Sequence, residues 1–327
     1  MIKHESNGKI QSLTCSRLHI FMEIIIMDIS VIIPAFNHEK FIALSIKSVL
    51  NQSYGAFELI IINDGSTDRT EKEILQFKDP RIRYLTQENH GAHYTLNKGI
   101  AIAQGKYISI LNSDDEYSPD RLMQCFDFIK QYPDVTAVLT WVEGINSDGK
   151  SVSDMPTPHT IAWQDWYTDA LKLYENNDFL KCAFAKNIAI TTSNFFIKKS
   201  AFDVTGQFNK LRYAHDWDML LHISRNFKVG LLKKRLLRYR IHESNTVLEA
   251  GSAAKVQLEV NWLIAHHLKQ LQPTENLIDP ICSLRKNHYV NMEMIITLLL
   301  LNEYFPDDKN PMTARLLEFL RKSDHSR

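Results

Sequence analysis

Short apolar runs alternate with amphipathic stretches along the first 142 residues. The runs are rich in Ile, Val and Leu, as is typical of parallel strands that are covered on both faces. The stretches between them carry apolar residues at helical spacing, for example Ile42, Ile46 and Val49. The predicted strands are 29–34, 57–62, 82–85, 107–111 and 135–142, and the predicted helices are 38–51, 67–77, 93–103 and one that begins at 118–119. This order indicates an α/β fold with a doubly wound, mainly parallel sheet.

Local signals predict the ends of two of these helices. Gly105 is expected to close the helix at 93–103 as a C-cap, because glycine adopts the left-handed conformation without strain. Ser118 is expected to cap the following helix, with Pro119 in its first turn. A further strand is expected at 191–196, in the second half of the chain.

Composition narrows the class of protein. The 327 residues are enough for one large domain or two smaller ones. Lys plus Arg and Asp plus Glu number 38 each, so no basic excess is present to neutralise phosphates, and a nucleic-acid partner is not favoured. The four cysteines are far apart and form no Cys-x-x-Cys pair, which makes a reducing cytoplasm the simpler expectation.

Both ends of the chain are expected to lie outside the main α/β domain. Residues 1–27 are expected to form a flexible extension, with the working protein beginning at or near Met27, and the apolar run at 20–27 is too short to span a bilayer. The main domain is expected at 28–245, with a first half at about 28–142 and a second half at about 143–245. A helical region is expected at 246–327, with helices near 256–268 and 292–301. Its role is left open between packing on the main domain, homo-oligomer formation and peripheral contact with the inner membrane face.

Polar residues follow three of the predicted strands at the points where these strands end. In a right-handed doubly wound sheet the turns 34–37, 63–68 and 112–115 lie along one edge, which is where such sheets bind ligands. Asp114 and Asp115 are adjacent hard carboxylates that can hold Mg²⁺ or Mn²⁺, and through the ion a diphosphate. The alternative is a pair of solvated turn acids before a helix.

Asp64 is a second candidate at this edge. It is followed by Gly65, which permits a tight turn and a close approach of a ligand. Its carboxylate can accept a hydrogen bond from a pyrimidine ring N–H or a ribose hydroxyl, and the alternative is a helix-capping turn built on Ser66 or Thr67. The chain lacks both Gly-x-Gly-x-x-Gly and Gly-x-x-x-x-Gly-Lys-Ser/Thr, so a dinucleotide fold and a P-loop are unsupported.

Six blocks of sequence occur in the order and spacing of a known family. They are the segments 31–37 with 48–53, 58–68, 89–91, 96–100, 105–108 and 113–115. With these blocks the chain resembles the family 2 glycosyltransferases over roughly residues 28–245. The resemblance implies a GT-A fold, which is a mixed, Rossmann-like nucleotide half joined to an acceptor half. It also implies a Mn²⁺ or Mg²⁺ cofactor, a nucleoside-diphosphate sugar donor with uridine as the expected base, and inversion at the anomeric carbon.

The resemblance also implies roles for residues on the donor side. The residues assigned to the donor are Pro34, Ala35, Phe36, Asn37, Asp64, Asn97, Asn112, Asp114 and Arg240, and those assigned to the metal are Asp114, Asp115 and His242. Asn63 and Asn112 stand where many relatives carry Asp, so some negative charge is lost. Which of the two adjacent aspartates contacts the metal is left open, and for His242 a plain surface histidine is the alternative.

A catalytic base is implied at Asp216. Its segment resembles the family's Glu-Asp-x-Asp, in which the Asp removes a proton from the acceptor hydroxyl, although His215 replaces the Glu here. The alternative for Asp216 is a plain helix N-cap. Three residues are assigned to the acceptor, Trp217, Asp218 and Asn194, with core packing as the alternative for the tryptophan.

Two functions follow. The first is an inverting, metal-dependent glycosyltransferase that moves a sugar to a saccharide or lipid-linked acceptor in cell-surface polysaccharide synthesis. The second is a nucleotide-sugar-binding module without catalysis, which the departures at Asn63, Asn112 and His215 favour.

Overall fold

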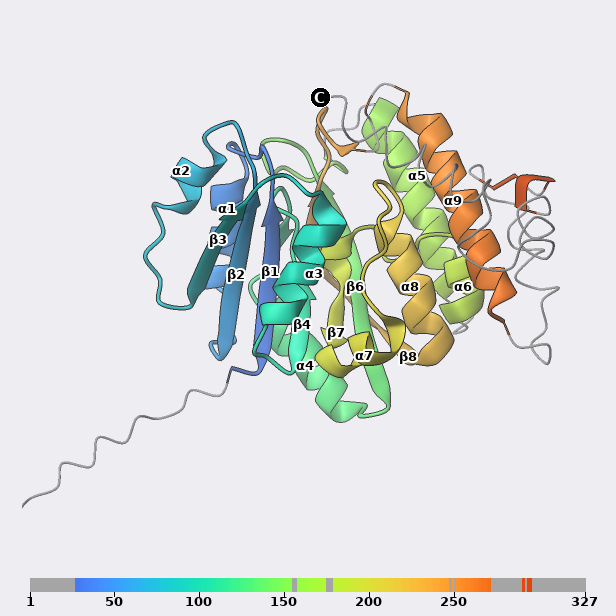
Figure 1. Ribbon diagram of the computed structural model, residues 1–327, viewed down its shortest axis with the longest axis horizontal. Coiled ribbons are helices and arrows are strands. Elements are labelled where there is room, and N and C mark those ends of the chain that lie inside the picture. The colour runs from blue at the N-terminus through green and yellow to red at the C-terminus, as the bar shows by residue number, and fades with distance from the viewer. Residues whose placement is uncertain are drawn as a thin grey trace, which may run out of the picture.

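One mixed sheet with helices on both faces organises the molecule (Figure 1). The computed structural model describes residues 27–154, 158–174, 179–246, 249, 251–271, 290–291 and 293–295. Within these residues the sheet has eight strands in the order β3-β2-β1-β4-β7-β6-β8-β5. Strands β3, β2, β1 and β4 are parallel to one another, β7 runs antiparallel to β4 and β6, and β5 runs antiparallel to β8.

The elements follow one another along the chain in an alternating order. The strands are β1 (Ile29–Ala35), β2 (Phe57–Asp64), β3 (Ile82–Gln87), β4 (Tyr107–Ile110), β5 (Glu116–Tyr117), β6 (Val135–Ile145), β7 (Phe196–Lys198) and β8 (Lys228–Arg240). The α-helices are α1 (Ile42–Leu50), α2 (Thr70–Ile74), α3 (Ala92–Ile102), α4 (Arg121–Gln131), α5 (Pro158–Tyr174), α6 (Phe179–Ala185), α7 (Phe202–Thr205), α8 (His215–Asn226) and α9 (Ser252–Lys269). Two short 3₁₀ helices are η1 (Thr192–Asn194) and η2 (Lys199–Ala201).

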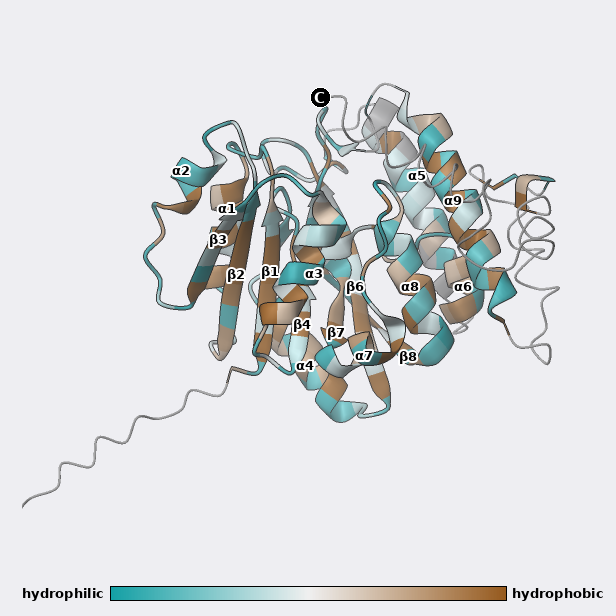
Figure 2. Cartoon of the chain, viewed as in Figure 1, coloured by the Kyte–Doolittle hydropathy of each residue, from teal (hydrophilic) through white to brown (hydrophobic). Residues whose placement is uncertain are grey.

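Two hydrophobic cores, one on each face of the sheet, explain the continuous apolar strands. In β1, Ile29, Val31 and Ile33 belong to the core with α1 and α4, whereas Ile32 belongs to the core with α3 and α8. Because side chains alternate across a strand, both faces need apolar residues when both are covered. The central strands are accordingly hydrophobic along most of their length (Figure 2).

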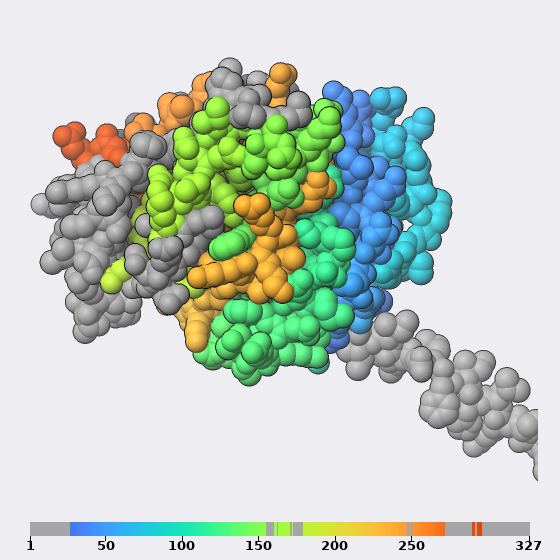
Figure 3. Space-filling view, turned by 180° about the vertical axis from the view of Figure 1, so that it is seen from behind, coloured from blue at the N-terminus to red at the C-terminus, as the bar shows by residue number. Residues whose placement is uncertain are grey.

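The predicted α/β fold and all five strands predicted up to residue 142 are confirmed, with small shifts at their ends. The view from behind shows the amino-terminal elements, in blue and cyan, at one side of the molecule (Figure 3). The sheet continues without a break from the donor half into the acceptor half, because β4 pairs with β7. That pairing makes the sheet mixed, as the resemblance implied.

Three local expectations are wrong. Gly105 is no C-cap, because α3 ends at Ile102 with Ala103 as its C-cap, and a Cβ on Gly105 would lie 2.5 Å from the backbone nitrogen of Ser30. Ser118 caps no helix, because α4 begins at Arg121 and the Ser118 backbone instead donates to β8 beside the short strand β5. The expected strand at 191–196 is mainly η1, and β7 begins only at its last residue.

Helix α9 packs on the catalytic domain through one buried carboxylate. Glu259 is 3% exposed, and its side chain accepts hydrogen bonds from the backbone N–H groups of Arg212, Tyr213 and Ala214 at 2.7–3.0 Å. These three residues lead directly into α8, so α9 fixes the start of that helix. Of the roles left open for the carboxyl-terminal region, the described residues of α9 show packing against the rest of the fold.

The remaining expectations for the two ends fall largely beyond what the structure describes. Residues 1–26 and most of the apolar segment at 292–301 lie outside the described residues. Within the described part, none of the helices combines the length and the apolar character that crossing a membrane requires.

Candidate active site

The first two turns at the carboxyl edge are tied together by Asn37. Strands β1 and β2 end in register, with Ala35 beside Asn63, so their turns meet. The Asn37 side-chain oxygen accepts a hydrogen bond from Thr67 N at 2.8 Å, and Asn37 N donates to Ser66 Oγ at 3.0 Å. Asn37 has φ of 50°, a left-handed conformation that asparagine tolerates better than most residues. The turn is therefore shaped by its own sequence.

The neighbouring residues of the predicted nucleotide pocket differ in exposure. Ala35 is buried at the end of β1, and Pro34 is half-buried. Phe36 is 43% exposed, which leaves an aromatic ring open at this edge. An open ring at the end of a central strand is suited to contact a flat base or a sugar.

Asp64 holds a neighbouring loop. Its Oδ1 accepts from Gln87 Nε2 at 2.7 Å and from His90 N at 3.0 Å, and its Oδ2 accepts from Gly91 N at 2.9 Å. Asp64 is only 3% exposed. The carboxylate thus fixes the start of α3, and a contact with a base remains an expectation that this arrangement does not test.

The two adjacent aspartates have different surroundings. Asp115 is fully buried, and its carboxylate accepts from Ser193 Oγ at 2.6 Å and from Arg240 N at 2.9 Å. Burial and the neighbouring charge of Asp114 raise the pKa of Asp115 well above its usual range. Asp115 thus joins the turn to η1 and β8. Its role at the metal stays a prediction, and Asp114 is the aspartate of the pair that lies next to histidine side chains.

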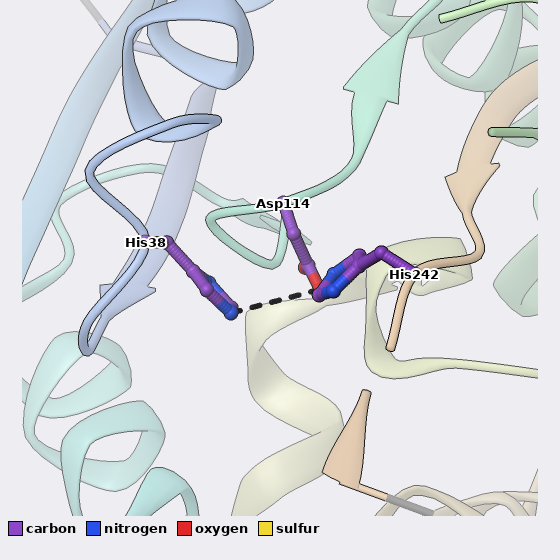
Figure 4. Close-up of side chains that lie close together, drawn as sticks. All are labelled: His38, Asp114 and His242. Carbon is purple, nitrogen blue, oxygen red and sulfur yellow. Dashed lines mark hydrogen bonds and ion pairs between the residues drawn. The ribbon is translucent and has the colours of Figure 1, made fainter. Parts of the chain in front are cut away.

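Asp114 lies between two histidines that come from other parts of the chain (Figure 4). Its Oδ2 is 3.0 Å from His242 Nε2 and 3.9 Å from His38 Nε2. Each imidazole is oriented through its Nδ1, which lies 2.7 Å from Ser113 Oγ for His38 and 2.8 Å from Ser244 Oγ for His242. These contacts lower the pKa of Asp114 although burial acts in the opposite direction.

The donor set of this cluster fits a divalent metal ion. Carboxylate oxygen and imidazole nitrogen are both common ligands, and metal-bound histidines are usually oriented through their second nitrogen, as these are. Two ligand atoms at about 2.1 Å from one ion are about 3.0 Å apart at a right angle and about 4.2 Å apart when opposite. The three atoms here lie within 4.8 Å of one another, so a small inward movement would bring them to one ion.

Sequence reasoning missed His38. A single histidine in a loop carries no periodic signal, and His38 belongs to no motif of metal-binding histidines in the sequence. The signal that could have found it is positional: His38, Asp114 and His242 each follow a strand of the sheet by two to four residues.

Arg240 lies beneath the acid turn. It is fully buried, and it donates from Nε to Asp114 O at 2.8 Å and from Nη1 to Asn146 O at 2.9 Å. Its Nη2 pairs with Glu116, and its guanidinium stacks over Phe41 at 5.0 Å. The Arg240 guanidinium thus supports the acid turn, and its role in donor binding stays a prediction.

Asp216 lies in the first turn of α8 and is not its N-cap, which is Ala214. Its Oδ1 accepts from Trp217 N at 2.7 Å and its Oδ2 from Asn187 Nδ2 at 2.9 Å. Burial raises the pKa of Asp216, and the charge of His215 opposes this rise. A raised pKa strengthens a carboxylate as a proton acceptor near neutral pH.

Tyr239 precedes Arg240 in β8. Burial raises its pKa, and so do the charges of Asp115, Asp114 and Asp216. Its ring stacks on that of Trp163 at 5.8 Å, so β8 and α5 are in contact here.

Asn63 and Asn112, which stand where many relatives carry Asp, both use their amide groups in hydrogen bonds within the fold. Asn112 Nδ2 donates to Thr191 Oγ1 at 2.9 Å, and its Oδ1 accepts from Thr192 Oγ1 at 2.7 Å. Asn63 Nδ2 is 3.4 Å from Tyr84 Oη. An ionised aspartate has no hydrogen to donate, so both amides make bonds that the acid could not.

Four further residues that were predicted to bind ligands are buried or hydrogen-bonded within the fold, and their ligand roles stay predictions. Asn194 and Asp218 are fully buried, and Trp217 is 5% exposed with Nε1 donating to Ala183 O, so the structure gives none of the three an open face for an acceptor. Asn97 exchanges two hydrogen bonds with the Phe208 backbone, at 2.9 and 2.8 Å. It also lines a cavity of about 660 Å³ near the start of β4, away from the acid turn that follows the end of that strand.

The sheet order, with its antiparallel β7, and the acid turn at the carboxyl edge define the GT-A fold of nucleotide-sugar enzymes. Solved structures of the same shape agree. S. aureus TarS in complex with UDP-GlcNAc superposes with a TM-score of 0.62 at 18% identity, over 84% of this chain and 81% of that one. A mannosyltransferase from Pyrobaculum calidifontis in complex with GDP-Man and Mn²⁺ superposes with a TM-score of 0.54 at 14% identity, over 89% and 79%.

The family is shown by sequence. The model of glycosyl transferase family 2 matches residues 30–203, more than half of the chain, and the chain therefore belongs to this family. It is 28% identical to an uncharacterised glycosyltransferase of Methanocaldococcus jannaschii, over 73% of this chain and 81% of the relative. It is 26% identical to a chondroitin synthase of Escherichia coli over 75% of this chain, which spans only 32% of that synthase. Its class of activity is thus glycosyl transfer.

Proposed function

We propose that this chain is an inverting glycosyltransferase that moves a sugar from a UDP-sugar to a hydroxyl of a saccharide or lipid-linked acceptor, in the synthesis of a cell-surface polysaccharide. The observation that carries the proposal is the acid turn at the carboxyl edge of the sheet, where Asp114 Oδ2 lies 3.0 Å from His242 Nε2, in a chain that the family 2 model matches over residues 30–203. Uridine is proposed because TarS, a structural neighbour, was solved with UDP-GlcNAc and with UDP.

The donor half would bind the nucleotide along the carboxyl edge. Phe36 offers an open aromatic face to the base or ribose, and Asn37 keeps the turn in the shape that exposes it. Asn112 stands at the end of β4, where its amide can bond a ribose hydroxyl. The diphosphate would then lie toward Asp114.

A divalent ion held by Asp114 and His242 would neutralise the charge that develops on the leaving diphosphate. Asp216 would accept the proton of the acceptor hydroxyl as that oxygen attacks the anomeric carbon from the opposite side. Asn187 and the Trp217 N–H fix the carboxylate, so that its position is set before the acceptor binds. Attack from the side opposite the leaving group inverts the anomeric configuration.

The test combines binding and turnover. We expect UDP-sugars to raise the melting temperature in the presence of Mn²⁺, because a ligand at 100 times its dissociation constant adds about 2.7 kcal/mol to the free energy of unfolding. We also expect the protein to release UDP when an oligosaccharide acceptor is added. NMR of the product should show the anomeric configuration opposite to that of the donor sugar. A retained linkage, or stabilisation by GDP-sugars in place of UDP-sugars, would contradict the proposal in its mechanism or its donor.

The departures at Asn63, Asn112 and His215 favour a second candidate, a nucleotide-sugar-binding module without catalysis. Calorimetry separates the two. Metal-dependent UDP binding without turnover on any acceptor would support the module, and release of UDP at a rate that depends on acceptor concentration would support the enzyme.

A further inference from the structure

A third ligand, His38, gives the candidate metal site a composition that the family resemblance did not imply. His38 lies three residues after β1, and Figure 4 shows its ring directed toward Asp114 from the side opposite to His242. Its Nε2 is 3.9 Å from Asp114 Oδ2, which is beyond hydrogen-bond distance. The site therefore presents two imidazole nitrogens and one carboxylate oxygen.

The partners of the two rings leave both Nε2 atoms able to bind a metal. A serine hydroxyl can either donate or accept, so Ser113 and Ser244 satisfy either tautomer of His38 and His242. With the proton on Nδ1, each ring turns an Nε2 lone pair toward Asp114. Metal-ligating histidines have this arrangement, with the second nitrogen donating to an oxygen.

A second cluster among the described residues contains a histidine whose Nε2 carries the proton and so has no lone pair for a metal. Asp218, His222 and His267 also lie within reach of one ion, between α8 and α9. His267 Nδ1, however, is 3.1 Å from Arg225 Nη1, and a guanidinium only donates. The His267 proton is thus kept on Nε2, which is 3.0 Å from Asp218 Oδ1, so this cluster is a hydrogen-bonded contact between helices.

Packing holds the two histidines of the candidate site in place. The Phe41 ring lies 4.8 Å from the His242 ring and 6.3 Å from the His38 ring, measured between centroids. Phe41 is itself 8% exposed and is covered by Arg240, whose charge is paired with Glu116. A site built on packed side chains keeps its geometry without a ligand, which lowers the entropy that an incoming ion must overcome.

We propose that His38, Asp114 and His242 together bind a first-row transition ion such as Mn²⁺ before the nucleotide arrives, and that they discriminate against Mg²⁺. Mg²⁺ prefers oxygen ligands and is usually held by one or two carboxylates together with substrate phosphates, whereas imidazole favours transition ions. Three protein ligands provide binding that does not need the phosphates. The inference relies on the proposed function only for the identity of the diphosphate that joins the ion later.

The experiment uses the full chain, freed of metal by a chelator, and titrates it with Mn²⁺ alone and with Mg²⁺ alone in a calorimeter. We expect one Mn²⁺ per chain without nucleotide, and Mg²⁺ binding at least tenfold weaker. His38→Gln should weaken Mn²⁺ binding at least tenfold and make it depend on added UDP. His222→Gln, which changes the second cluster, should leave Mn²⁺ binding unchanged, and melting temperatures check that each variant folds.

Pulsed electron paramagnetic resonance of the wild-type Mn²⁺ complex gives a measurement that needs no variant. Couplings to two imidazole nitrogens are expected, and coupling to one alone would overturn the proposal. Unaltered Mn²⁺ affinity in folded His38→Gln, or binding only when UDP is present, would also overturn it. Such results would leave the proposed sugar transfer standing, since that is judged by turnover and by Asp216. If the protein binds Mn²⁺ as expected but transfers no sugar, the proposed function is contradicted and the metal-site proposal stands.

Discussion

Replacing the proposed base by its amide, Asp216→Asn, removes one charge and almost no volume. The hydrogen bonds of the site allow this change to be accommodated locally. Trp217 N can donate to the introduced carbonyl as it does to the carboxylate. Asn187 Nδ2 would face the introduced NH₂ group, but Asn187 Oδ1 is buried and has no hydrogen-bond partner within the described residues. Turning the Asn187 amide over therefore restores a donor–acceptor pair.

The magnitudes separate folding from catalysis. One net hydrogen bond contributes about 0.5–1.5 kcal/mol, and here one is exchanged for another, so the free energy of unfolding should change by less than about 1 kcal/mol. A positioned base contributes about 10²- to 10⁴-fold to the rate, so kcat should fall by that factor while the affinity for UDP is unchanged. In the wild type, kcat/KM should rise with pH along a limb above the ordinary Asp pKa of about 4, because burial raises the pKa of Asp216 and only its ionised form accepts a proton.

The assay measures UDP release with and without acceptor, UDP affinity by calorimetry, and unfolding by urea. Asp203→Asn, an exposed position on α7, is the control for the loss of one negative charge. If Asp216→Asn keeps more than about a tenth of the wild-type kcat, the base is another residue. If transfer and UDP binding are lost together, Asp216 acts on the donor instead, and the reasoning fails as well.

Three further outcomes follow from packing and pairing. Glu259→Leu should lower the free energy of unfolding by about 3–5 kcal/mol by urea titration, because three backbone N–H groups lose the buried carboxylate that accepts from them; a loss below about 1 kcal/mol would show that water replaces the carboxylate. Gly105→Ala should destabilise by several kcal/mol, since its Cβ would meet the Ser30 backbone, whereas Gly55→Ala, with open space around it, should be neutral within about 0.5 kcal/mol; equal melting temperatures of the two variants would contradict the close approach. Arg240→Met should destabilise by about 3–5 kcal/mol, because the backbone carbonyls of Asp114 and Asn146 lose a fully buried donor and Glu116 keeps only Arg238 as its partner; unchanged stability at pH 7 would argue against the support that we assign to Arg240.

The central fold was predictable because local pattern and burial coincide there. Strands β1, β2 and β4 are covered on both faces, so nearly all of their residues are apolar and each strand appears in the sequence as a continuous apolar run. Strands β5 and β7 have two and three residues, too few for any period to show, and they exist because β8 and β4 offer edges to pair with. These partners are distant in sequence, so no local signal announces them.

The site was predictable in its position and less so in its roles. A strand end located Asp114 and the family resemblance located Asp216, but the side chains that decide between an open and a buried carboxylate come from distant parts of the sequence. Asp115 is closed off by Ser193 and Arg240, which lie 78 and 125 residues further along the chain. Asn97 and Asn194 look like ligand-binding amides in sequence and are bound to backbone in the structure. Burial of this kind depends on tertiary contacts alone.

The hydrogen bonds between Glu259 of α9 and the backbone that leads into α8 have a consequence for protein engineering. The segment that matches the family model stops at residue 203. A protein shortened to about residue 245 would therefore keep every motif named above. Such a truncation would discard Glu259 and release the peptide that presents Asp216, leaving three amide hydrogens stranded. Truncated or chimeric proteins should therefore include the chain through Lys269. A chimera with a different carboxyl-terminal segment needs a carboxylate in that segment to accept from the backbone N–H groups of residues 212–214.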